Sequence, residues 1–380
     1  MAVAATIVTE SHPGRRPLRH HGGMTRLSAT LHRDLPRLIA FAAMSWVLCA
    51  CGSIRYYAQA AHGQGELVFK RQPVRKLLKD PATDPKLAAR LSLALAAREF
   101  ASRELDLPDN RSYTSYVDLH RPYVVWNVFA TPRYSVEAVR HCFPVAGCVA
   151  YRGWFGEAAA EADAARMQRK GDDVWVGGVP AYSTLGWFAD PILSSMLRWD
   201  DDELAGTIFH ELAHQLIYAK GDTAFNESFA TFVQTEGLRE WRAARALPAD
   251  DGHAQAMADG FTKLVLELRE RLKKFYASGV DAEAMEAGKQ REIAAFRARY
   301  AAWRDAHWPG DHRYDAWVAK PINNARLLPF GLYDQWTPAF AVIFRESGAQ
   351  WPAFYARVRA LARESKAKRD AALQVLLGTR

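Results

Sequence analysis

The most informative segment of this chain reads Thr207-Ile208-Phe209-His210-Glu211-Leu212-Ala213-His214-Gln215. It lies in a stretch where leucine or isoleucine recurs every fourth residue from 204 to 216, a spacing that predicts a helix with one apolar face. On such a helix His210 and His214 project from the same side, so both imidazoles can bind one Zn²⁺. Glu211 lies about 100° further round, close to the metal but outside its ligand set.

A second helix is expected to supply the third protein ligand that a zinc site requires. Lys220-Gly221 ends the first helix, and the next begins near Ala224, so its first turns return beside the histidine pair. Glu227 is the expected ligand, because three flanking phenylalanines indicate burial and a lone buried carboxylate is costly. Glu236 is the alternative.

The chemistry expected of these residues is hydrolysis of a peptide bond. Zn²⁺ lowers the pKa of water and polarises the scissile carbonyl, while Glu211 acts as general base and then as general acid. A tyrosine commonly stabilises the oxyanion in such sites. Tyr333 is the first candidate and Tyr182 the second, although either ring can equally be a packed core residue. The strand expected at residues 174–178 is a possible edge for an extended peptide to join.

Two motifs carry a resemblance to known proteins: the 209–215 segment and Gly221-Asp222-Thr223-Ala224-Phe225-Asn226-Glu227-Ser228-Phe229-Ala230. Together they resemble the gluzincin metallopeptidases, and more closely a family of bacterial lipoproteins called predicted aminopeptidases. The likeness runs through nearly all of residues 51–365. It implies a zincin-like fold, His210, His214 and Glu227 as ligands of one Zn²⁺, and Glu211 as the general base and acid.

The chain departs from the gluzincin pattern in two respects. Twelve residues, 215–226, separate the second histidine from Glu227, where the typical aminopeptidase of that group has eighteen. The Gly-x-Met-Glu-Asn motif, which holds the free amine of the substrate in those enzymes, is absent. Aminopeptidase activity is therefore implied by the family, whereas the residues alone indicate a zinc peptidase. A zinc endopeptidase and a non-catalytic zinc-binding scaffold lipoprotein of the envelope stay open as alternatives.

The first fifty residues have the features of an export signal. A basic region precedes an apolar run at 38–48, which is too short to span a bilayer, since a spanning helix needs about 20 residues. The run ends Leu48-Cys49-Ala50-Cys51, which resembles a bacterial lipobox and predicts a lipid on Cys51. We therefore expect an exported protein, lipid-anchored in the bacterial cell envelope and facing the periplasm. An ordinary signal peptide or an uncleaved anchor is the alternative, and either Met1 or Met24 can be the start.

The composition excludes collagen-like, disordered and polytopic membrane proteins. The 380 residues are 49% hydrophobic and 24% charged, which is typical of a globular chain. The formal charge of +8 suggests a nucleic-acid partner, but residues 1–50 hold six arginines and two acids. Their removal leaves 330 residues with a charge of +4 and no nucleic-acid-binding motif. The expected partners are a peptide substrate and a membrane.

The chain is expected to contain a signal peptide at 1–50, a tether at 51–65 and one catalytic unit at 66–380. Strands are expected within 113–130, 148–151 and 174–176, and helices over 66–78, 85–105, 155–170, 201–219, 224–245, 251–278, 282–306, 334–345 and 351–375. A mixed part, about 66–200, followed by a helical part, about 201–380, defines an α+β fold. Cys142 and Cys148 are expected to form a disulfide in an oxidising compartment, with two buried thiols as the alternative.

Overall fold

The computed structural model describes residues 55–143, 147–330 and 335–378. Its first element is a helix over 55–69, so most of the expected tether is ordered secondary structure. The Tyr56 ring packs edge-on against Trp154 with centroids 5.5 Å apart, and the Gln59 amide hydrogen-bonds to the backbone of Gly153 and Phe155. This helix is therefore part of the packed domain. The residues expected to be lipidated or cleaved, 1–51, lie outside the described ranges.

The helix expected over 66–78 does not form. The first helix ends at residue 69, and the short strand β1 (Gln72–Pro73) and the single-turn helix α2 (Val74–Leu77) follow. Pro73 explains the break, because proline has no backbone N–H for a helix interior and favours an extended conformation in the residue before it. β1 instead pairs with β2 (Ser115–Val117), and β2 pairs in parallel with β8 (Ile192–Leu193).

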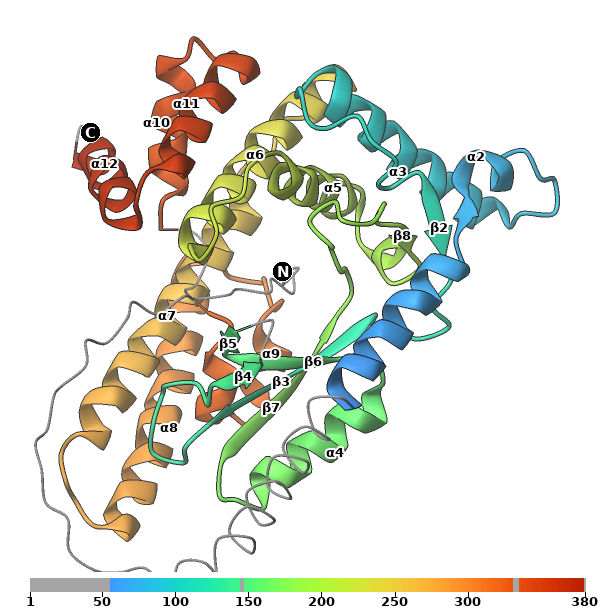
Figure 1. Cartoon of the computed structure of the whole chain (residues 1–380). Coiled ribbons are helices and arrows are strands. Elements are labelled where there is room, and N and C mark those ends of the chain that lie inside the picture. Colours follow the sequence, from blue (N-terminus) through green and yellow to red (C-terminus); the bar gives the residue numbers. More distant parts are fainter. Residues whose placement is uncertain (1–54, 144–146, 331–334, 379–380) are drawn as a thin grey trace, which may run out of the picture.

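A second sheet forms the mixed part of the fold. Its order is β6-β3-β7, with β3 (Val125–Thr131) between β6 (Tyr151–Trp154) and β7 (Asp173–Val179), all antiparallel. Every residue of β3 is buried, because α4 (Glu157–Gln168) covers one face and the 3₁₀ turn η2 (Asn324–Leu327) packs near the other. In this strand order β7 lies at an edge of the sheet, and β7 is the strand that the sequence analysis names as a possible edge for an extended peptide (Figure 1).

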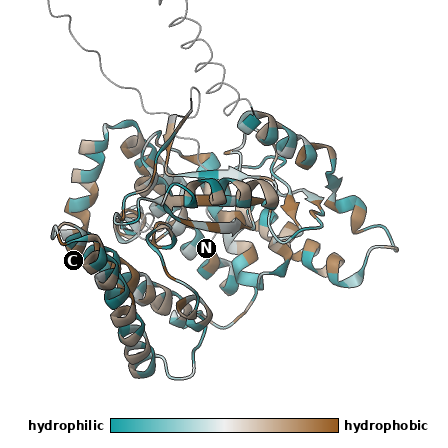
Figure 2. Cartoon of the chain, turned by 90° about the horizontal axis from the view of Figure 1, so that it is seen from below, coloured by the Kyte–Doolittle hydropathy of each residue, from teal (hydrophilic) through white to brown (hydrophobic). Residues whose placement is uncertain are grey.

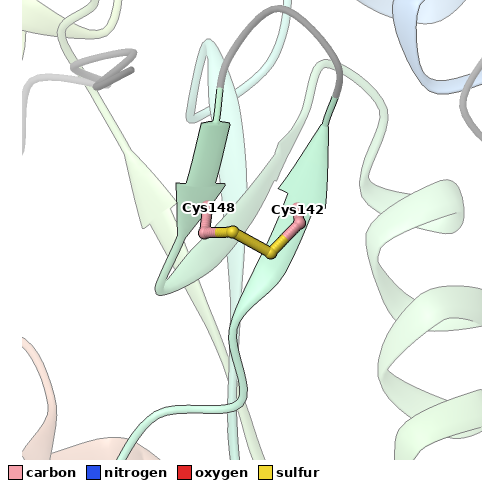
Figure 3. Close-up of a disulfide and its surroundings, with 2 residues drawn as sticks. All are labelled: Cys142 and Cys148. Atoms are coloured by element: carbon pink, nitrogen blue, oxygen red, sulfur yellow. A yellow bond between two sulfur atoms is a disulfide. The ribbon is translucent and has the colours of Figure 1, made fainter. Parts of the chain in front are cut away.

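A disulfide joins Cys142 to Cys148, which confirms the predicted bridge over the alternative of two buried thiols. The two cysteines lie directly opposite each other on the antiparallel strands β4 (His141–Phe143) and β5 (Gly147–Val149), as Figure 3 shows. The bridge closes this small hairpin.

Helices make up most of the remaining chain (Figure 1). They are α3 (Pro85–Arg103), the turn η1 (Met196–Arg198), α5 (Asp201–Leu216), α6 (Thr223–Ala244), α7 (His253–Tyr276), α8 (Ala282–His307), α9 (Asp315–Ala319), α10 (Thr337–Glu346), α11 (Trp351–Arg363) and α12 (Lys366–Gly378). The helix expected over 351–375 is two helices, because Glu364 takes an extended backbone between α11 and α12. The described structure is mixed and mostly helical, which agrees with the α+β expectation.

The buried hydrophobic residues of the described ranges form one main core, a separate core at the α7–α8 pair and two smaller clusters on the two faces of β3. The main core joins α3, α5 and α6 with α10, α11 and α12, so the C-terminal helices cover the outer side of α6. Figure 2 shows hydrophobic and hydrophilic residues sharing most helices, as expected where one face packs and the other meets water. None of the helices in the described ranges is both long enough and apolar enough to cross a membrane.

Candidate functional site

The helix α5 forms where the sequence predicts it. Asp200 caps its start, accepting a hydrogen bond from the Glu203 N–H at 2.7 Å, and acidic residues fill the first turn. Leu204, Ile208 and Leu212 of the apolar stripe are fully buried, and Leu216 at its end is half-buried. Burial of this stripe fixes the rotation of the helix, so His210 and His214 face α6 on the adjacent side.

The start of α6 is fixed by two side chains. Asp222 is its N-cap residue and accepts a hydrogen bond from the Phe225 N–H. Asn226 bonds both backbone groups of Ala219, with its Oδ1 2.7 Å from the Ala219 N and its Nδ2 2.9 Å from the Ala219 O. These two hydrogen bonds close the turn between the two helices. The twelve-residue spacing is therefore sufficient to return Glu227 to the histidine pair.

His210, His214 and Glu227 form a buried group that can hold a metal ion. The two Nε2 atoms are 3.1 Å apart, and the Glu227 carboxylate oxygens lie 3.3 Å from the Nε2 of His210 and 3.5 Å from that of His214. A tetrahedral zinc with bonds of about 2.0–2.2 Å needs ligand atoms roughly 3.3–3.6 Å apart. Two edges of the triangle lie in this range and the edge between the two Nε2 atoms is slightly shorter, so its size is close to that of a three-ligand zinc site and its donor set is the same.

Gln234 orients one of the three side chains of the triangle, and the sequence analysis did not identify it. Its Oε1 lies 3.1 Å from the Nδ1 of His210 and accepts a hydrogen bond from the N–H there, so that in the neutral ring the lone pair is on Nε2, toward the metal position. Gln234 follows Glu227 by seven residues, two helical turns, and both face α5. That spacing is the signal in the sequence that could have identified it.

The charged forms of Glu227 and His210 stabilise each other. Burial alone would raise the pKa of the Glu227 carboxyl, but the adjacent His214 and His210 imidazoles hold that pKa well below its ordinary value. Burial is the largest single influence on His210 and acts to lower its pKa. The hydrogen bond and charge of Glu227, the charge of Glu211 and the hydrogen bond to Gln234 together outweigh it, so the pKa lies above its ordinary value. Without a metal, the triangle therefore favours an ionised carboxylate beside a protonated imidazole.

Glu211 lies beside this triangle and outside it. Its side chain is 1% exposed, and within the described chain its Oε2 is buried without a hydrogen-bond partner. Its charge contributes to the raised pKa values of two buried neighbours, Tyr113 and Asp190, although burial is the larger cause in both. Glu211 is thus a buried carboxylate with an unused acceptor, next to a possible metal position.

The remaining sequence candidates have different outcomes. Tyr333 lies outside the described residues. The Tyr182 ring packs edge-on against Phe155, and burial raises the pKa of its hydroxyl. Glu236, the alternative ligand, is ion-paired with Arg239 at 2.6 Å and does not belong to the triangle.

The comparisons with known proteins give one match. A family model described as "Putative aminopeptidase" matches residues 55–373, which include α5 and α6 with all three members of the triangle. No curated protein and no solved structure matches the chain.

Proposed function

Since the chain belongs to the family described as "Putative aminopeptidase", we propose that it is a zinc-dependent peptidase acting as an aminopeptidase. The observation that carries the metal dependence is the buried triangle of His210, His214 and Glu227, whose edges fit tetrahedral zinc. The pairing of α5 with α6 supports a zincin-like arrangement of this part of the fold.

The residues around the triangle have distinct tasks in this proposal. Zinc, when bound, polarises the scissile carbonyl and lowers the pKa of the water that attacks it. Glu211 accepts a proton from that water on its unpartnered Oε2 and donates the proton to the leaving amine. Gln234 keeps the His210 ring in one tautomer, so its Nε2 stays available as a ligand.

The oxyanion that develops in the reaction needs a further hydrogen-bond donor. Tyr182 is supported by its position next to Ser183, whose hydroxyl donates to the Asp190 carboxylate that also accepts from Gln215 of α5. Support for Tyr333 comes from the chain that follows it. The Trp336 N–H donates to the Ser228 Oγ at 3.1 Å, and Ser228 is the neighbour of Glu227.

We also propose that the protein is exported and held to the envelope membrane by a lipid on Cys51. The lipobox-like segment ending at Cys51 supports this, as does the basic and apolar sequence before it. The Cys142–Cys148 bridge is further support, because disulfides persist in oxidising compartments such as the bacterial periplasm.

The test is metal content together with peptide hydrolysis by the full chain purified in detergent. We expect one zinc per chain and cleavage of peptides with a free N-terminus. Cleavage that continues when the N-terminus is blocked would identify an endopeptidase. Zinc without cleavage of any peptide in a library would favour the scaffold alternative, and a chain that binds no zinc would overturn the proposal.

A further inference from the structure

The segment between β7 and β8, residues 180–191, exposes two adjacent aromatic side chains. Trp187 is 86% exposed and Phe188 is 48% exposed. Large aromatic side chains contribute strongly to binding when another molecule covers them, and exposed neighbouring pairs often mark recognition sites. The position and the rigidity of this loop indicate what covers these two rings.

A buried carboxylate holds the loop in shape. Asp190 is 1% exposed and accepts hydrogen bonds from the Thr184 hydroxyl at 2.7 Å and from the Ser183 hydroxyl at 3.3 Å. The Thr184 hydroxyl oxygen in turn accepts from the Phe188 N–H at 3.0 Å, and the Thr184 carbonyl accepts from the Trp187 N–H at 3.1 Å. The backbone that carries both rings is therefore fixed before anything binds.

The same carboxylate ties the loop to the helix of the metal centre. Gln215 donates from its Nε2 to the Asp190 Oδ2 at 3.4 Å, and Asn110 holds the other side of the Gln215 amide at 2.8 Å. A Cβ placed on Gly186 would lie 3.4 Å from the Gln215 side chain, so the loop rests directly on it. Gln215 follows His214 in the sequence. It also lies one helical turn beyond Glu211, so the loop sits on the Glu211 side of α5.

We propose that Trp187 and Phe188 form a subsite for an apolar side chain of the peptide substrate. This inference rests on the proposed peptidase activity. The rings are adjacent, solvent-exposed and held on the helix that supplies the base and two of the metal ligands. A preorganised apolar surface in that place binds a substrate side chain without the entropic cost of ordering a loop. The subsite favours large apolar residues, such as leucine or phenylalanine, over alanine at one substrate position.

The test compares two peptide series that differ at one position, with leucine or phenylalanine in one and alanine in the other. In the full chain, Trp187→Ser and Phe188→Ser are each expected to raise KM about tenfold for the large apolar residues, with little change for alanine. Trp187→Phe should restore most of the preference. Phe69→Ser is the matched control, because Phe69 is 90% exposed at the end of the first helix, and it should leave every constant unchanged.

Binding measured without turnover separates this inference from the proposed function. The zinc-loaded Glu211→Gln chain should bind the leucine peptide about tenfold more tightly than Glu211→Gln combined with Trp187→Ser. If the unsubstituted chain cleaves no peptide, the proposed function is wrong. If it cleaves peptides and neither loop substitution changes KM or Kd for the large residues, the subsite is wrong and the peptidase proposal stands.

Discussion

Arg369, in the last helix, forms a buried ion pair with Asp222, which caps the helix that carries Glu227. The Arg369 Nη2 lies 2.9 Å and its Nε 3.0 Å from the Asp222 Oδ2, and the two side chains are 5% and 1% exposed. The Arg369 guanidinium also lies over the Phe225 ring, 5.3 Å from its centroid. α12 therefore holds the turn that sets the position of Glu227.

Replacing Arg369 by methionine is expected to destabilise the protein by up to about 3–5 kcal/mol, because the buried Asp222 would lose this partner and keep only the Lys366 ammonium, 3.6 Å from its Oδ1. The free energy of unfolding in urea measures this. Adding Asp222→Asn, which retains a good N-cap without the charge, should recover part of the loss. Asp222→Asn alone completes the double-mutant cycle, and losses that simply add in the double variant would show that the two residues are not energetically coupled.

Gln234 is expected to act on zinc affinity through His210. Gln234→Leu removes the acceptor for the Nδ1–H and should weaken zinc binding about 10–100-fold, as seen when the hydrogen-bond partner of a metal ligand is lost. Gln234→Glu retains an acceptor for this hydrogen bond and should therefore bind zinc more tightly than Gln234→Leu. Competition with a chelator of known affinity measures both, and an unchanged Kd for Gln234→Leu contradicts the role.

Substitutions of Glu211 and of Glu227 are expected to differ in their effects on zinc binding and turnover. Glu211→Gln should retain zinc and lose turnover by a factor of about 10²–10⁴, the range for a general acid–base group. Glu227→Gln should lose zinc as well, because the proposed site has this carboxylate as one of only three protein ligands. Glu236→Gln, which removes a carboxylate paired with Arg239 on the same helix, is the control and should retain both. Metal content and kcat, measured together, distinguish the three.

The oxyanion donor is expected to be one of two tyrosines. Phenylalanine at the correct position removes only a hydroxyl and should lower kcat about 10²–10³-fold with a much smaller change in KM. Tyr333→Phe and Tyr182→Phe are each other's control. Full activity in both variants would assign the donor to another group.

The metal-free and zinc-bound forms are expected to respond oppositely to pH. His210 has a raised pKa, so its stabilising contribution is complete below its ordinary value of 6.5 and is lost as pH rises through the raised value. Glu227 has a lowered pKa, so its contribution is present above 4.5 and is lost only as pH falls through the lowered value. The triangle thus stabilises the metal-free fold most between about pH 4.5 and 6.5.

Zinc must displace the proton on His210, so its affinity should fall as pH drops, beginning above pH 6.5. Thermal unfolding between pH 4 and 9, with zinc and with a chelator, checks both trends. The gain in Tm from zinc should grow with pH. A constant gain across this range would mean that His210 does not exchange a proton for the metal.

The sequence by itself determined the local part of the site. The four-residue repeat and the acidic start define α5, and helical periodicity alone places His210 and His214 on one face with Glu211 beside them. A short turn before a second helix was enough to select Glu227, because two consecutive helices joined by a tight turn pack against each other. These inferences use contacts between residues close in the chain, where backbone geometry leaves few choices.

Only the tertiary structure decided how this local site is supported. Asp222 and Arg369 are 147 residues apart, and Asn110 meets Gln215 across 105 residues. No repeat or motif marks such pairs, because they depend on how separate helices and loops pack together. The same limit explains the first helix over 55–69, most of which the sequence analysis assigned to a tether. Its contacts include residues of β6, almost a hundred positions later in the chain, and Arg121.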